Sequence, residues 1–179
     1  MATFAGERVN ARSLGFAVAL VVFGLDQLAK WVVTGPLHVQ DLEHFYLLPF
    51  FQFTYTQNVG ISLGLLNATT EVGRWMLVAL TSAIAVGVAY WMVREKNRVD
   101  LVALGMVLGG ALGNILDRTL HGYVVDFLDL HFGAWRLFLI FNVGDAAISI
   151  AVVILLLRAF VSRKDHAKGK EPEETIEHA

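Results

Sequence analysis

GGALGNILDRTLHGYVVDFLDLHFGAWRLFLIFNVGDAA, residues 109–147, combines apolar runs with an unusual concentration of carboxylates and carboxamides. It repeats the pattern Asn-x-x-Asp, as Asn114/Asp117 and as Asn142/Asp145, and each copy lies at the edge of a long apolar run. Such groups are costly to keep beside membrane hydrocarbon, so their presence indicates a functional site. The four aspartates of this segment are Asp117, Asp126, Asp129 and Asp145.

The composition of the whole chain is that of a membrane protein. Hydrophobic residues make up 56% of the 179 and only 17% are charged, whereas soluble domains are about a quarter charged. The absence of cysteine excludes disulfides, cysteine-ligated metals and thiol nucleophiles. The six histidines form no zinc-binding pattern, and no basic run suggests a nucleic-acid partner. We therefore expect neither a metal nor another cofactor, and no nucleic acid.

Four apolar runs are long enough to cross a membrane as helices. We predict spans at residues 14–33, 75–93, 99–116 and 141–161, within one integral membrane domain that covers residues 1–179. The first run resembles a signal peptide, but no small-x-small cleavage pattern follows it, so we interpret it as an uncleaved helix.

The predicted spans are separated by segments of different character. Residues 34–73 contain two prolines and the aromatic run FYLLPFFQFTY, which favours a small β-rich element outside the membrane. We interpret residues 117–140 as a mixed amphipathic segment and residues 162–179 as a charged tail. The predicted fold class is an all-α membrane core of four helices with a small β-rich element.

Basic residues lie near positions 8–12, 94–98 and 158–170, at alternate ends of the predicted spans. The positive-inside rule then places both termini in the cytoplasm, and residues 34–73 and 117–140 outside. In this topology Asp26, Asp117 and Asp145 meet near the outer boundary of the membrane. Asp126 lies in the segment that links two of them, so a site formed by these carboxylates faces outward.

Two features of the predicted helices have both a structural and a functional interpretation. Asp26 and Lys30 are one helical turn apart and can form an ion pair. This pair either neutralises the charges for insertion, with Lys30 reaching to the membrane interface, or helps to pack the site. Gly105, Gly109 and Gly113 share one face of the third span, which allows a neighbouring helix to approach closely.

The Asn-x-x-Asp copies also have ordinary explanations. Asn142 can cap the fourth span with Asp145 in its first turn, and Arg118 can pair with Asp117. However, a helix cap needs only one of Asn142 and Asp145, and Ala146 leaves room for a ligand. Two carboxylates placed close together cannot both ionise, so one holds a proton while the other activates water, as in aspartyl proteolysis. The residues alone leave open which two aspartates pair among Asp26, Asp117, Asp126, Asp129 and Asp145.

Five blocks of the sequence resemble, in order, the signature blocks of bacterial lipoprotein signal peptidase. This family is the type II signal peptidase, an intramembrane aspartyl protease. The blocks are DQLAK (26–30), TQNVGISLG (56–64), GGALGNILDR (109–118), VVDF (124–127) and FNVGDAAI (141–148), within a resemblance that covers residues 14–160. The resemblance implies a catalytic pair of Asp126 and Asp145, with Asp117 in a supporting role. The other residues that match substrate-binding or supporting positions are Asn58, Gly110, Asn114, Arg118, Asn142, Asp26 and Lys30.

The same resemblance implies an architecture and a substrate. Members have four transmembrane helices, an extracytoplasmic β-cradle and a short extracytoplasmic helix. We expect this protein to be a monomer in the bacterial cytoplasmic (inner) membrane. The implied substrate is a prolipoprotein that already carries diacylglycerol on its lipobox cysteine, cleaved just before that cysteine. The chain departs from the usual pattern at Ser62-Leu63, where the family has Ala-Phe, and at Gly144 and Ala146, where it commonly has alanine and serine.

Two other classes of function remain as alternatives. A transporter or channel that couples to protons or cations would also use buried aspartates. It would distribute them along a path across the membrane and use broken helices in paired repeats, whereas these carboxylates gather at one face. A membrane scaffold without activity would not need both Asp126 and Asp145.

Overall fold

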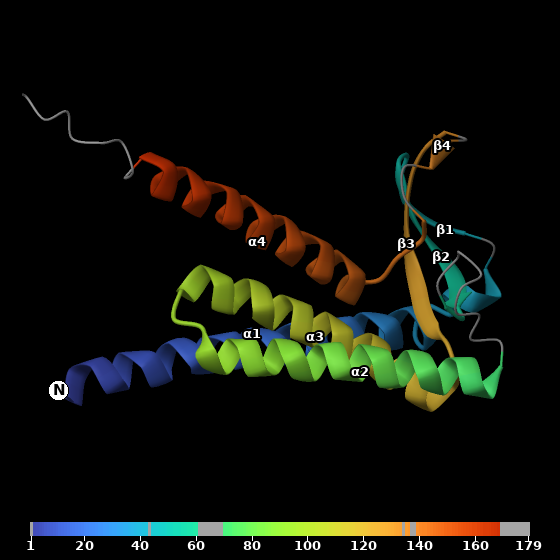
Figure 1. Ribbon diagram of the computed structural model, residues 1–179. Coiled ribbons are helices and arrows are strands. Elements are labelled where there is room, and N and C mark those ends of the chain that lie inside the picture. Colours follow the sequence, from blue (N-terminus) through green and yellow to red (C-terminus); the bar gives the residue numbers. More distant parts are fainter. Residues whose placement is uncertain (1, 43, 61–69, 134, 137–138, 169–179) are drawn as a thin grey trace, which may run out of the picture.

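The structure of the chain, a computed structural model, describes residues 2–42, 44–60, 70–133, 135–136 and 139–168. Four long helices form a bundle, and a small sheet lies at one end of it (Figure 1). The helices are α1 (Ala2–Thr34), α2 (Glu71–Arg94), α3 (Arg98–His121) and α4 (Val143–Lys168). Each contains an apolar segment long enough to cross a membrane. The predicted four-helix membrane core is therefore confirmed.

Of the helix boundaries that differ from the predicted ones, two change the setting of polar residues at the candidate site. α3 continues for more than a turn beyond residue 116, so Asp117 and Arg118 lie within it and not in a linking segment. Gly122, with a φ of 86°, then ends this helix in the left-handed conformation that glycine adopts without steric cost. α4 begins after Asn142 instead of at residue 141, so the asparagine stands just before the helix.

The central helix of the bundle is α3. It packs against α1, α2 and α4, and half of its membrane span is buried, compared with 22% or less for the spans of the other three helices. Its face toward α1 and α2 contributes to an apolar core formed by Ala19, Ala85, Met92, Leu101, Leu104 and Leu108. The helix that carries Asn114 and Asp117 is thus the most buried of the four membrane helices.

Small residues on α3 let the neighbouring helices approach closely. A Cβ atom on Gly105 or Gly109 would collide with the backbone oxygen of Gly15 or Ala19 on α1, which confirms the predicted close approach. On another face, a Cβ atom on Gly110 would collide with the backbone oxygen of Gly144 at the start of α4. These contacts bring the polar residues of three helices within reach of one another.

The sheet consists of β1 (Phe45–Leu48), β2 (Phe51–Asn58), β3 (Val124–Phe132) and the two-residue β4 (Trp135–Arg136), which pair in this order and antiparallel. The first two strands and a short 3-10 helix (Val39–Asp41) lie in the predicted β-rich segment. β3 lies outside it, within residues 117–140, for which the sequence indicates an amphipathic segment but does not specify a strand. The Ser62-Leu63 departure lies outside the described residues.

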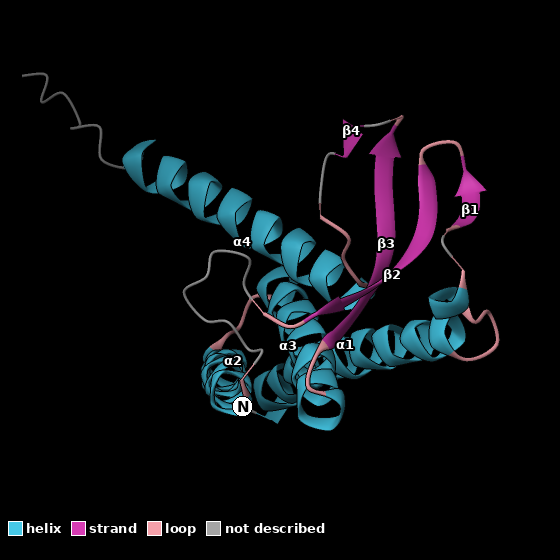
Figure 2. Cartoon of the chain, turned by 90° about the vertical axis from the view of Figure 1, so that its right-hand side faces the viewer, coloured by secondary structure: helices cyan, strands magenta, loops and turns pink. Residues whose placement is uncertain are grey.

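The sheet stands at the end of the bundle where α1 ends and α4 begins, away from the first residues of α1 (Figures 1 and 2). A second apolar core, formed by Val33, Val39, Val125 and Phe127, joins the end of α1 to β3. Burial of such side chains is the main attraction between the sheet and the helices. It fixes β3 against the helix ends that carry the polar residues.

Candidate active site

Strand pairing positions Asp126. In the register of β2 with β3, Asp126 lies opposite Thr56 and Val124 lies opposite Asn58, with an irregularity in the pairing between Phe53 and Thr56. Asn58 and Asp126 therefore lie close together on paired strands, and Asn58 Nδ2 donates to Asp126 Oδ2 over 3.0 Å. Asp126 is only 1% exposed.

The segment just before α4 is fastened to the same strand. The backbone N–H groups of Phe127 and Leu128 both donate to the Phe141 carbonyl, at 3.0 and 2.8 Å, and the Phe141 N–H donates back to Leu128 at 3.1 Å. Asn142 follows directly and lies beside β3. Its Nδ2 donates to Asp126 Oδ1 over 2.6 Å. Two elements distant in sequence thus meet at one carboxylate.

Asn142 and Asp145 form the N-terminal cap of α4. Asn142 Oδ1 accepts from the Asp145 N–H at 2.8 Å, and Asp145 Oδ2 accepts from the Asn142 N–H at 3.3 Å. This reciprocal pair is a capping box, which satisfies two backbone donors at once. The capping interpretation is confirmed, and the expectation that a cap needs only one of these residues is wrong. Capping leaves Asn142 Nδ2 free for Asp126, so the same residues belong to both the cap and the site.

Asn114 of α3 connects the two carboxylates. Its Nδ2 donates to Asp145 Oδ1 over 2.8 Å, and its Oδ1 accepts from Asn142 Nδ2 over 3.1 Å. Asp126 and Asp145 therefore each accept hydrogen bonds from amide groups of the same small network. The carboxylates come from β3 and α4, and the amides come from β2, α3 and the residue before α4.

A buried ion cluster lies next to this network. Lys30 Nζ is 2.7 Å from Asp26 Oδ2 and 2.8 Å from Asp117 Oδ2, and it donates to Asn114 Oδ1 over 3.2 Å. The predicted Asp26–Lys30 pair is confirmed. The alternative in which Lys30 reaches to the membrane interface is wrong, since the residue is 4% exposed and its ammonium is held inside by two carboxylates.

The cluster is also tied to the backbone of the elements that carry the site. Asp117 Oδ2 accepts from the Val125 N–H of β3 at 3.1 Å, and Asp26 Oδ1 accepts from the Gly144 N–H of α4 at 2.8 Å. Gln27 donates to Asp117 Oδ1 over 3.1 Å. Sequence reasoning missed Gln27, although an amide next to Asp26 within an apolar span is the same signal that singled out the other polar residues.

Asp117, Arg118 and Asp129 lie outside the amide–carboxylate network that joins Asp126 to Asp145. Asp117 is paired with Lys30, and among the described residues no ion pair joins it to Arg118. Arg118 is half-buried, and the charges of Asp145, Asp126 and Asp117 act on its guanidinium. Its Nε is buried without a hydrogen-bond partner in the described part of the chain. Asp129 lies further along β3, where it accepts from Gln52 at 2.9 Å and Thr54 at 3.1 Å.

The environment of Asp126 favours a proton on this group. Burial raises the pKa of Asp126 from 3.8 to about 6, and the nearby charge of Asp145 acts in the same direction. Hydrogen bonds from Asn58 and Asn142, and the charge of Lys30, oppose this rise. A carboxyl group with a pKa near neutrality can both take up and release a proton under physiological conditions.

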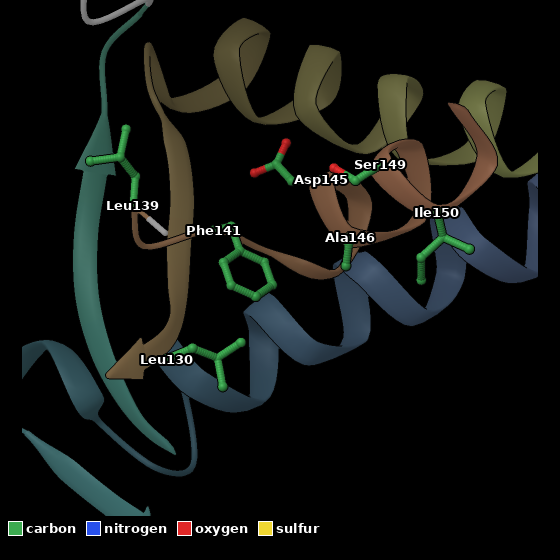
Figure 3. Close-up of a pocket in the computed structure, with 7 residues that line it drawn as sticks. All are labelled: Leu130, Leu139, Phe141, Asp145, Ala146, Ser149 and Ile150. Carbon is green, nitrogen blue, oxygen red and sulfur yellow. The ribbon is translucent and has the colours of Figure 1, made fainter. Parts of the chain in front are cut away.

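An apolar cavity of about 410 Å³ lies beside Asp145 (Figure 3). Asp145 is its one charged lining residue within the described chain, and Ala146 follows it on the same wall. The complete lining consists of Leu130, Leu139, Phe141, Asp145, Ala146, Ser149 and Ile150. An apolar chain next to a polar bond would fit such a space. Among the described residues, no three histidine or carboxylate groups are placed to hold a metal ion.

The structure brings the predicted site residues into one region. Asp126, Asp145, Asn58, Asn114 and Asn142 form the amide–carboxylate network. Asp26, Lys30 and Asp117 form the ion cluster, Gly110 lies at the contact of α3 with α4, and Arg118 lies near the carboxylates.

The family model described as signal peptidase (SPase) II matches residues 18–161. A lipoprotein signal peptidase of Rhizorhabdus wittichii is 49% identical over 173 residues, covering 97% of this chain and 98% of the relative. One of Sphingopyxis alaskensis is 50% identical over 147 residues, covering 82% and 85%.

Solved structures also resemble the fold. A bacterial membrane enzyme determined by the in meso method at 2.3 Å resolution superposes with a TM-score of 0.72 at 28% identity. The match covers 89% of this chain and 93% of the solved one. A second such structure, at 1.9 Å resolution, gives a TM-score of 0.69 at 28% identity and covers 81% and 91%.

Proposed function

This chain belongs to the signal peptidase II family, whose members are membrane peptidases that process lipoproteins, and we propose that Asp126 and Asp145 form its catalytic pair. The observation that carries the proposal is the shared amide network. Asn142 donates to both carboxyl groups, through Nδ2 to Asp126 and through its backbone N–H to Asp145. Two carboxyl groups held around one residue in a buried setting share one proton more readily than they carry two charges.

The pair supplies a complete acid–base cycle. The ionised carboxylate takes a proton from water while the water oxygen attacks the scissile carbonyl carbon, and the protonated partner donates to the carbonyl oxygen. When the tetrahedral intermediate collapses, the C–N bond breaks and the proton gained from water passes to the leaving amine. The hydroxyl formed from the carbonyl oxygen returns its proton to the partner carboxylate, which restores the starting state of the pair. The amides of Asn58, Asn114 and Asn142 hold the carboxyl groups in place throughout. No cofactor is required.

The proposed substrate is a prolipoprotein that carries diacylglycerol on a cysteine, cleaved just before that residue. Its lipid would lie in or near the apolar cavity, and the bond to be cut would then stand beside Asp145, which lines that cavity. Arg118 is suited to orient the substrate, because it lies near the carboxylates and its Nε has no hydrogen-bond partner among the described residues.

We further propose that the enzyme acts as a monomer in the bacterial cytoplasmic (inner) membrane, with both termini in the cytoplasm and the site near the outer leaflet. Basic residues support this orientation because Arg12, Arg94, Arg98 and Arg158 all belong to the helix ends away from the sheet. The diacylglyceryl group of the substrate lies within a membrane leaflet. A site next to the sheet, near the outer leaflet, would lie at the same depth as that group.

The test is cleavage of a diacylglyceryl-modified prolipoprotein by the purified protein in detergent. Asp126→Asn and Asp145→Asn keep the size of the side chain but cannot exchange a proton, so each variant should lose at least about 1,000-fold in kcat. Thermal unfolding of each variant establishes that it is folded. Near-normal cleavage by either variant would show that the pair is wrongly assigned.

Asp117→Asn is the matched comparison, because it makes the same chemical change in a neighbouring buried aspartate. It weakens the ion pair with Lys30 but leaves Asp126 and Asp145 intact, so we expect a folded protein with partial activity. A folded Asp117→Asn variant without activity, alongside an active Asp126→Asn variant, would move the pair to Asp117. A transporter would give no cleavage in this assay, even as the native protein.

A further inference from the structure

Two amide side chains, those of Asn114 and Asn142, stand between the carboxyl groups of the proposed pair. An amide has a donating and an accepting end, and only the donating NH₂ end stabilises a carboxylate. The direction of each amide therefore matters for catalysis. Turned the other way, an amide would place its oxygen against a carboxylate oxygen, which is repulsive.

The direction of Asn142 is set by the helix it caps. Its Oδ1 accepts from the Asp145 backbone N–H, a donor that cannot turn into an acceptor. Its Nδ2 must then face the other way, where it donates to Asp126 and Asn114. The cap therefore fixes the direction of this amide independently of Lys30.

Among the described residues, no backbone group orients the Asn114 side chain in this way, and Lys30 orients it instead. Asn114 Oδ1 accepts from Lys30 Nζ and from Asn142 Nδ2, which leaves Nδ2 to face Asp145. A reversed amide would bring its NH₂ against two donors, one of them a cation. Hydrogen bonds to a charged group are about twice as strong as neutral ones, so the lysine is the stronger of the two constraints.

Lys30 is itself held in relation to both halves of the pair. Asp26 and Asp117 bind its ammonium, and each also accepts a backbone N–H, from Gly144 on α4 and from Val125 on β3. Gly144 precedes Asp145, and Val125 precedes Asp126. The position of the ammonium is thus defined by the two elements that carry the catalytic carboxyl groups.

We propose that Lys30 is a positioning residue of the peptidase, which acts by fixing the direction of the Asn114 amide so that its NH₂ group faces Asp145. The proposal rests on the assignment of Asp126 and Asp145 as the catalytic pair. It goes beyond neutralisation of a buried charge, because a lysine that only balanced Asp26 and Asp117 would not need Asn114 for its effect on the reaction.

A double-mutant cycle between Lys30 and Asn114 tests this. We expect Lys30→Met to lower kcat by about 10- to 100-fold and Asn114→Leu by about 100-fold, each with KM changed less than about threefold. The kcat of the double variant should be at most about threefold lower than that of Asn114→Leu, because the lysine acts through the Asn114 amide. Lys96→Met, the same change at an exposed lysine between α2 and α3, should leave kcat unchanged.

Lys30→Met leaves two buried carboxylates without their partner, so a second comparison preserves the charge of the cluster. Lys30→Gln combined with Asp117→Asn keeps one net negative charge, so its comparison with the native protein leaves the charge of the cluster unchanged. Asp117→Asn alone shows how much of the effect comes from Asp117. We expect the added Lys30→Gln change to lower kcat about tenfold and to move the acidic limb of the pH–rate profile to higher pH.

The expected direction of that movement follows from the charges around Asp126. Asp145 raises the pKa of Asp126 and Lys30 lowers it, while Arg118 is the other cation near this group. Loss of Lys30 removes an attraction for the carboxylate, so the carboxyl group should ionise at higher pH.

Losses that multiply in the double variant, or an unmoved acidic limb, would overturn the proposal. If neither Lys30 variant can be purified in a folded state, the lysine is structural and the proposal is also wrong. These outcomes differ from failure of the catalytic assignment itself, which would appear as activity in Asp126→Asn or Asp145→Asn while the native protein cleaves the same substrate.

Discussion

Several residues of the site have more than one structural role. Asn142 caps α4 and holds Asp126, and Asp145 completes the cap and lines the cavity. Asp117 pairs with Lys30 and also accepts the Val125 N–H, which ties α3 to the start of β3. A residue that a sequence pattern explains as a simple helix cap can therefore also belong to the chemistry, because the second end of its side chain remains available.

The burial of Asp126 has a consequence for stability that mutation can measure. Its pKa is about 6 in the folded protein and 3.8 in its ordinary state, so the folded protein binds this proton more tightly than the unfolded chain does. The contribution to stability is therefore fully present below about pH 4 and is lost as the pH rises through about 6.

Asp126→Asn removes this ionisation, so the variant should gain stability relative to the native protein as the pH rises. The gain should be about 1 kcal/mol larger at pH 8 than at pH 5, by the linkage of pKa to the free energy of unfolding. Thermal unfolding of both proteins at the two pH values in one detergent measures it. Asp41→Asn, at an exposed aspartate of the 3-10 helix, is the control and should show no such dependence. An equal difference at both pH values for Asp126→Asn would contradict the expected burial cost.

At the scale of whole elements, the contacts of α3 decide where the polar residues meet. Gly109 faces α1 and Gly110 faces α4, so both neighbours lie closer to α3 than larger residues would allow. Hydrogen bonds that span three helices, such as those of Lys30 and Asn114, depend on these short distances. Packing of the bundle and formation of the site are in this sense one event.

Substitution of two glycines separates close approach from helix propensity. Gly109→Ala places a Cβ against the Ala19 backbone oxygen, whereas a Cβ on Gly87 of α2 meets nothing within 4 Å. We expect Gly109→Ala to destabilise the protein by about 1–3 kcal/mol, as overpacking does, and to lower activity. Gly87→Ala should be neutral or stabilising by up to about 1 kcal/mol. The unfolding midpoints of Gly109→Ala, Gly87→Ala and the native protein test this expectation. Equal stability of the two variants would mean that α1 and α3 can move apart without cost.

For the molecule as a whole, the sheet and the site lie at one end of the bundle and the basic helix ends lie at the other (Figure 1). This polarity is what the proposed orientation requires. Charged residues at the other end, such as the Arg158–Asp100 pair between α4 and α3 at 2.6 Å, hold the helices together away from the site.

The absence of cysteine makes the orientation directly testable. Tyr46→Cys introduces a thiol at an exposed position of β1, and Lys96→Cys introduces one between α2 and α3 at the opposite end. In intact spheroplasts, a membrane-impermeant maleimide should label the thiol at position 46 and not the one at 96. Both should react after permeabilisation, and the native protein should react in neither case. The reverse pattern in intact cells would invert the topology.

The sequence alone determined the features that depend on local or linear properties. Apolar length predicts each span, and the spacing of Gly105, Gly109 and Gly113 predicts a close helix contact. Depth along the helices predicts that Asp26 lies near the start of α4, where it accepts from the Gly144 N–H. Apolar length, residue spacing and depth along a helix can each be read from residue positions in the sequence. The resemblance of five short blocks then identified the family, which the comparisons show.

Only the tertiary structure decided how the polar atoms pair. β3 could not be predicted as a partner of β2, because pairing between residues near positions 56 and 126 depends on the fold and not on local propensity. The direction of the Asn114 amide and the burial of Lys30 depend on atoms from three helices at once. A hydrogen bond is short and directional, so its partner is fixed by three-dimensional position, which no local pattern in the sequence records.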